Sequence, residues 1–264
     1  MRAPVAVRSG RDIAALVHEI GFLPFYSTPV PGFSLRDLTD PAIWISNDQS
    51  VNPWYYRQDV ALDDRIVYGK LFDGKMGFVD IDLFPDFVRV RRDGRDPREM
   101  LEAGFLKPVD LAVLDAIPHG ESRTEPLIKE DLIVEPKGIP AALARLQTAT
   151  FLYTASFEYK LTRGGRPYGW PLAAYMRPEE ELGRERVFPR PERTYEAARA
   201  ALLERVLAVV PDALERSPDG VRRLIEFAMG PKAKTTKRAA KTARTALDFL
   251  PALKGGDSLG RAPA

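Results

Sequence analysis

The chain has 264 residues, of which 45% are hydrophobic, and this is enough for one large domain or two small ones with a proper core. The net charge of +2 is close to neutral, and the absence of cysteine excludes disulfides and thiolate sites. The N-terminus lacks the apolar core of a secretion signal, and no stretch approaches the roughly 18 apolar residues of a membrane span. We therefore expect a cytoplasmic protein that does not bind a membrane.

An aromatic-rich module with a β-hairpin is predicted over residues 1–105. Apolar side chains at helical spacing predict a helix over 11–20, closed by Gly21. Residues 22–60 are rich in proline and large rings, which favours an ordered layer made mostly of coil. The expected hairpin consists of strands over 65–72 and 76–81 around the turn-forming pair Asp73-Gly74.

A winged-helix module is predicted over residues 106–178. Its expected helices are 109–117, 127–134 and 138–147. Two β-prone runs follow, 149–159 and 168–175, and they flank Gly164-Gly165, which can supply the positive φ of a tight turn. The sequence therefore predicts an α+β fold in which helices are combined with small hairpins.

The winged-helix pattern indicates DNA as a partner. Arg163 and Arg166 flank the two glycines of the turn and could contact phosphates without reading sequence. Arg145 and Gln147 on the third helix could face a groove, since these side-chain types pair with guanine and adenine edges. The alternative is an exposed charged turn and a helix that packs inward.

Helices are expected over residues 179–230, and a basic segment follows over 231–264. Lys237 and Arg238 lie in an acid-free run of cations that would attract a polyanion. The run is either a DNA-contacting arm or a solvated, disordered tail.

Catalytic chemistry has few candidates. The two histidines, His18 and His119, are far apart in the sequence and form no metal-binding spacing, so we expect no metal and no cofactor. The remaining candidates are three carboxylates that could act as acid or base: Asp80, Asp82 and Glu158. Asp80 and Asp82 should share one side of a strand, whereas Glu158 lies in an apolar strand.

Several aromatic and structural strings of the chain resemble those of the AlkZ/YcaQ-like winged-helix DNA glycosylases, and in particular their "AlkZ-related" subgroup. The resemblance covers roughly residues 11–230. The strings are Gly21-Phe22-Leu23-Pro24-Phe25, Asn52-Pro53-Trp54-Tyr55-Tyr56-Arg57, Lys75-Met76-Gly77-Phe78-Val79, Phe84-Pro85-Asp86-Phe87, Leu143-Ala144-Arg145-Leu146-Gln147 and Arg166-Pro167-Tyr168-Gly169-Trp170.

The resemblance implies a winged-helix fold and double-stranded DNA as partner, with Trp54 and Tyr55 as candidates for stacking on an extruded base. It does not carry the activity over, because the Gln-x-Gln type motif of the glycosylases is absent where residues 21–26 follow the first helix. Two alternatives stay open. One is a non-enzymatic DNA-binding regulatory protein, and the other is an enzyme on a small molecule, with an aromatic pocket that includes Trp44 and Tyr56.

Overall fold

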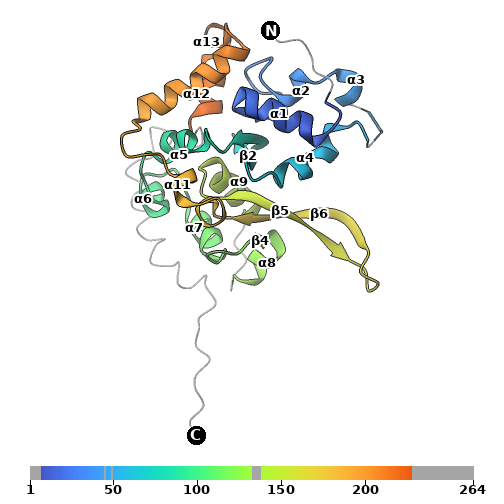
Figure 1. Cartoon of the computed structure of the whole chain (residues 1–264). Coiled ribbons are helices and arrows are strands. Elements are labelled where there is room, and N and C mark those ends of the chain that lie inside the picture. The colour runs from blue at the N-terminus through green and yellow to red at the C-terminus, as the bar shows by residue number, and fades with distance from the viewer. Residues whose placement is uncertain (1–6, 45, 49, 133–137, 228–264) are drawn as a thin grey trace.

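The computed structural model describes residues 7–44, 46–48, 50–132 and 138–227 (Figure 1). These residues form helices and two three-stranded antiparallel sheets, so the predicted α+β class is confirmed. The sheets are small, and helices account for most of the body around them (Figure 1).

Three antiparallel strands in the order β1-β3-β2 form the first sheet. They are β1 (Phe22–Pro24), β2 (Ile66–Phe72) and β3 (Lys75–Asp80). The predicted hairpin between β2 and β3 is confirmed. Asp73 and Gly74 both have positive φ, as the favoured two-residue turn requires.

The predicted N-terminal helix is α1 (Gly10–Ile20), and it ends at Gly21, whose φ is +92°. The described residues within 22–60 form the ordered, coil-rich layer that the sequence predicts, and they also hold β1 and three short helices. They are α2 (Leu35–Leu38), α3 (Pro41–Trp44) and α4 (Pro53–Ala61). Pro41 and Pro53 each begin a helix, at a position where the N–H that proline lacks has no helical partner.

The second sheet belongs to the predicted winged-helix module. The elements in chain order are α7 (Pro108–Asp115), β4 (Arg123–Thr124), α8 (Glu125–Glu130), α9 (Ile139–Thr148), β5 (Tyr153–Leu161) and β6 (Pro167–Met176). Three helices and a hairpin are present as predicted. The short strand β4 completes a sheet in the order β4-β6-β5. This succession of helices and strands follows the order predicted for the second module.

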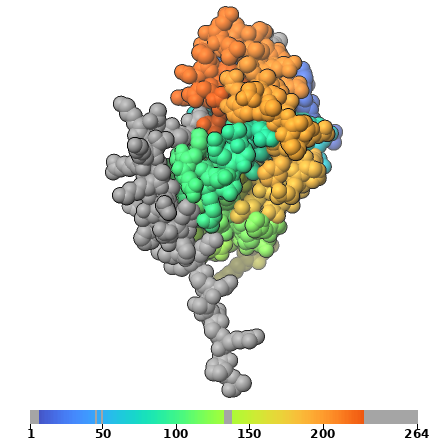
Figure 2. All heavy atoms as spheres, turned by 90° about the vertical axis from the view of Figure 1, so that its left-hand side faces the viewer, coloured from blue at the N-terminus to red at the C-terminus, as the bar shows by residue number. Residues whose placement is uncertain are grey.

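Further helices pack against both modules. They are α5 (Phe84–Arg92), α6 (Pro97–Glu102), α10 (Pro178–Glu181), α11 (Arg184–Val187), α12 (Tyr195–Val209), α13 (Ala213–Arg216) and α14 (Pro218–Ile225). The long helix α12 packs on α5. In Figure 2 the orange C-terminal helices lie against the green segment that precedes the second module.

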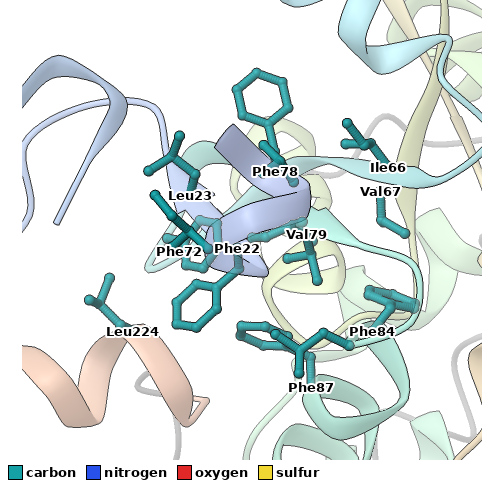
Figure 3. Close-up of a cluster of buried hydrophobic side chains, with 14 of the residues drawn as sticks. Phe22, Leu23, Ile66, Val67, Phe72, Phe78, Val79, Phe84, Phe87 and Leu224 are labelled. Atoms are coloured by element: carbon teal, nitrogen blue, oxygen red, sulfur yellow. The ribbon is translucent and has the colours of Figure 1, made fainter. Parts of the chain in front are cut away.

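The first hydrophobic core is built on phenylalanine rings. The ring of Phe22 lies 5.0 Å from that of Phe87 and 5.8 Å from that of Phe72. Leu224 of α14 belongs to the same cluster (Figure 3). A second cluster, which includes Leu111 of α7, lies mainly in the second module. The C-terminal helices therefore share the core of the N-terminal half.

Candidate nucleic-acid interface

The hairpin formed by β5 and β6, here called the wing (Tyr153–Met176), is held to the body at its stem. Tyr153 is buried, and the ring of Phe157 lies 6.0 Å from that of Tyr68. Further out, the Tyr159 hydroxyl donates a hydrogen bond to Gln58 Oε1 at 3.0 Å. Figure 1 shows the remaining length of the wing projecting away from the helices. Its outer part is therefore accessible from both faces.

The tip of the wing is a short turn that presents two arginines. The Gly165 N–H donates to the Thr162 carbonyl, and the Thr162 N–H donates to the Arg166 carbonyl, both at 2.9 Å. Gly165 has a φ of +73°, which fits a three-residue hairpin loop with a glycine bulge. Arg163 and Arg166 are exposed at this turn. Exposure fits both a phosphate contact and a solvated charged turn, so the phosphate contacts stay a prediction.

Large hydrophobic side chains are exposed along the same hairpin. The described part of the chain has eight such residues, and four of them lie on the wing. These four are Tyr159, Leu161, Tyr168 and Trp170, with exposures of 44%, 60%, 52% and 69%. Single exposed apolar residues are common on soluble proteins, but their concentration on one projecting hairpin indicates an interaction surface.

A bulge in β6 sets the position of Trp170. Glu158 pairs with Leu172 and Lys160 pairs with Tyr168, so one residue of β5 lies opposite three residues of β6. Gly169 within the bulge has a φ of +73°, a conformation that favours glycine. Sequence reasoning missed this feature, although the Gly169-Trp170-Pro171 string interrupts an otherwise regular strand pattern.

The expectation that α9 enters a DNA groove does not match its placement. The helix packs between α7 and β2, and most of its side chains are buried. Arg145 is 7% exposed, and its guanidinium forms a two-pronged ion pair with the buried carboxylate of Asp110. A side chain held in this way cannot reach a base edge without breaking a buried ion pair.

The side chain of Gln147 also forms its hydrogen bonds inside the protein. Its Oε1 accepts a hydrogen bond from the Lys70 N–H at 3.0 Å, and its Nε2 donates to the Leu143 carbonyl at 2.9 Å. The neighbouring Thr148 hydroxyl donates to the Lys70 carbonyl at 2.9 Å. Lys70 lies on the edge strand β2, where its backbone groups lack a strand partner. Gln147 and Thr148 thus complete the edge of the first sheet, and we carry neither Arg145 nor Gln147 into the proposed interface.

The three candidate carboxylates lie in different environments. Glu158 is exposed on the outer wing, which corrects the expectation of an apolar surrounding, because the strand has left the body at that point. Asp82 is exposed and pairs with Arg65 at 2.8 Å. Asp80 is 7% exposed and lies at the end of β3. Burial therefore distinguishes Asp80 from the other two.

Asp80 pairs with a histidine that is 62 residues away in the sequence. Its Oδ2 lies 2.5 Å from Nδ1 of His18 on α1, and its Oδ1 accepts the Asp82 N–H at 2.8 Å. The His18 side chain is 36% exposed. A carboxylate at Nδ1 favours the tautomer that carries its proton there, which leaves Nε2 to accept a proton. The sequence contains each residue but no local signal for the pair.

The candidates for base stacking lie on α4. The guanidinium of Arg57 lies 3.5 Å from the centroid of the Trp54 ring and covers one of its faces. Tyr55 is 37% exposed. The ring of Trp44 lies 5.0 Å from that of Phe25, so the aromatic rings of this region pack against one another. Stacking on Trp54 and Tyr55 stays a prediction.

Lys237 and Arg238 lie outside the described residues. Within the described ranges, no three acidic or histidine side chains gather where they could hold a metal ion. No helix in the same ranges is long and apolar enough to cross a membrane.

Comparisons with known proteins give one family and one solved structure. The model of the family described as "AlkZ related" matches residues 7–222. The DNA glycosylase AlkZ of Streptomyces sahachiroi has a similar structure, with 11% sequence identity and a TM-score of 0.45. The match covers 94% of this chain and 60% of that one, so the chain spans less than two thirds of its length. None of the curated proteins matches this chain.

Proposed function

Because the chain belongs to the AlkZ-related family, we propose that it binds double-stranded DNA and that the wing supplies the phosphate contacts. The observation that carries the proposal is the exposed, projecting turn with Arg163 and Arg166. Lys160 is also exposed, and residues 159–168 contain no acidic side chain. A concentration of cations on a narrow projection suits a polyanionic backbone.

The wing is the part of the proposed interface that a substitution can test without disturbing the fold. Replacing Arg163 and Arg166 together by alanine should weaken binding to all duplex sequences alike, because phosphate contacts carry no sequence information. Loss of two contacts should flatten the slope of log K against log salt by about 1.8. Fluorescence anisotropy of a labelled duplex over a salt series measures both quantities.

A matched control removes two exposed arginines elsewhere. Arg98 on α6 and Arg222 on α14 are both exposed, so their double alanine variant has the same net charge as the wing variant. We expect the slope of this control to stay near that of the unmodified chain. Equal slopes for the wing variant and the unmodified chain would remove the wing from the interface.

Base excision is a second candidate function, favoured by the His18–Asp80 pair. A half-exposed imidazole on a buried carboxylate can take a proton from water, as the hydrolysis of a glycosidic bond requires. The glutamine motif of the glycosylases is nevertheless absent at residues 21–26. We therefore favour DNA binding without robust excision.

Excision can be tested directly by base release from alkylated duplex DNA. We expect no detectable release by the unmodified chain. If release is measured, Asp80→Asn should abolish it. The amide is neutral and replaces one of the two acceptor oxygens by a donor, so it no longer holds the proton of His18 on Nδ1 as a carboxylate does. Asp82→Asn and Glu158→Gln are the matched controls, since both carboxylates are exposed. Robust release that survives all three substitutions would mean that the active site lies elsewhere.

The alternatives predict other outcomes. A non-enzymatic regulatory protein would bind DNA and release no base under any condition. An enzyme on a small molecule would show neither salt-dependent DNA binding nor an effect of the wing substitutions.

A further inference from the structure

The outer wing exposes aromatic rings as well as cations, and phosphate binding explains only the cations. We propose that Tyr168 and Trp170 stack on unpaired bases, so that the wing selects DNA with unpaired bases over fully paired duplex. This inference rests on the proposed DNA binding and adds the structure of the DNA that is preferred.

The two faces of the wing are different. Successive side chains of a strand point to opposite faces. Phe157 and Tyr159 of β5 both contact the body, through Tyr68 and Gln58, so their shared face is turned toward it. Lys160 points to the other face, together with its cross-strand partner Tyr168. This outward face therefore pairs a cation with an aromatic ring.

The side chain of Trp170 is largely exposed to solvent. It lies in the bulge where β6 has residues without a partner on β5, and 69% of its surface is exposed. Pro171 restricts the backbone on one side of it, because the φ of proline is fixed by its ring. A ring exposed to this extent can stack on a ligand without first displacing a neighbouring side chain.

Stacking requires a base with an open face. In a paired duplex both faces of each base are covered by its neighbours, whereas an unpaired base exposes them. Base–aromatic stacking tolerates all four bases because each has a π-face. The cations at positions 160, 163 and 166 can then bind the phosphates of the same strand. Together the two contact types define a site for a strand with unpaired bases.

A negatively charged membrane is disfavoured by the order of residues along the hairpin. Arg163 and Arg166 occupy the tip, and the aromatic rings lie behind them. Insertion into a bilayer would bring the arginines into the apolar region first, which is costly. With DNA, the same order lets the tip remain at the phosphates while the rings reach bases.

The test uses the full chain and two matched probes, a labelled duplex and the same duplex with a short central bubble of unpaired bases. We expect the bubble to bind more tightly. Replacing Tyr168 and Trp170 by alanine should lower bubble affinity by about tenfold for each ring lost. Duplex affinity should change less than about threefold, and the preference should disappear. Trp170→Phe should retain most of the preference for the bubble. Leu62→Ala, at an exposed position of the body, should change neither affinity.

Tryptophan fluorescence separates stacking from an indirect structural effect. The chain has three tryptophans, and Trp44 and Trp54 are partly buried. The bubble should therefore quench the emission of the unmodified chain, and Trp170→Phe should lose the part of the quenching that comes from the wing. The melting temperature should be the same in all these variants, because the substituted side chains are exposed.

Failure of this inference is distinguishable from failure of the proposed function. Equal affinity for bubble and duplex, with both lowered by the Arg163/Arg166 variant, would overturn base stacking and leave DNA binding intact. If the unmodified chain binds neither the bubble nor the duplex at any salt concentration, the inference and the proposed function are both overturned. Quenching by phosphatidylserine vesicles without a preference for the bubble would assign the rings to a membrane and overturn the inference.

Discussion

Replacing Asp110 by alanine should lower the free energy of unfolding by about 3–5 kcal/mol, because it leaves the buried guanidinium of Arg145 without its partner. The carboxylate of Asp110 is fully buried and accepts from two nitrogens of Arg145, with distances of 2.5 and 2.8 Å. Burial raises the pKa of Asp110, and the hydrogen bonds from Arg145 oppose that shift. Urea unfolding followed by circular dichroism measures the change.

The decrease in the free energy of unfolding should arise because the buried charge of Arg145 is left unpaired, and not because the ion pair itself stabilises the fold strongly. A double variant, Asp110→Leu with Arg145→Met, should therefore be more stable than Asp110→Ala alone. The exposed pair of Asp212 and Arg216 is a matched control, and Asp212→Ala should cost less than about 1 kcal/mol. A double variant as unstable as the single one would show that the pair is itself required for α7 and α9 to pack.

The same pair shows where sequence reasoning reaches its limit. The position of α9 follows from its apolar spacing, and the structure confirms the helix. Its environment does not follow, because one face meets α7 and another meets β2 from the N-terminal half. Arg145 and Gln147 look like solvent-facing polar residues when only their own helix is considered. The partners that bury them, Asp110 and Lys70, are 35 and 77 residues away.

Local sequence signals were sufficient to predict the hairpin of the wing, but they were insufficient to predict the environments of the candidate carboxylates. The Gly-Gly turn and β-prone runs predict a hairpin, since these depend on residues a few positions apart. Whether Glu158 is buried depends on where the hairpin leaves the body, and whether Asp80 meets His18 depends on how α1 lies on the first sheet. Neither property has a sequence signal near the residue concerned. The helix α5 was also missed, because arginines interrupt its apolar pattern and two of them, Arg91 and Arg92, are buried.

Arg91, one of these two buried arginines, gives the second large prediction. It is 3% exposed, and among the described residues no carboxylate is found to act on its charge. Its guanidinium donates instead to three backbone carbonyls, those of Thr148 at 2.9 Å, Leu224 at 3.1 Å and Ile225 at 3.3 Å. These residues end α9 and α14, and the carbonyl end of a helix carries partial negative charge. Burial lowers the pKa of Arg91 to about 9, so the side chain is still a cation at neutral pH.

Replacing Arg91 by leucine should therefore destabilise the protein by at least about 3 kcal/mol, because three buried carbonyls lose their donor and each unpaired group costs roughly 1–3 kcal/mol. Arg91→Lys should recover only part of the loss, since an ammonium lacks the planar fork that reaches both helix ends. Arg98→Leu on the surface is the control and should change stability by less than about 0.5 kcal/mol. Urea midpoints at a constant m-value provide the comparison. A midpoint for Arg91→Leu equal to that of the unmodified chain would show that α14 is held by its apolar contacts alone, such as Leu224 in the first core.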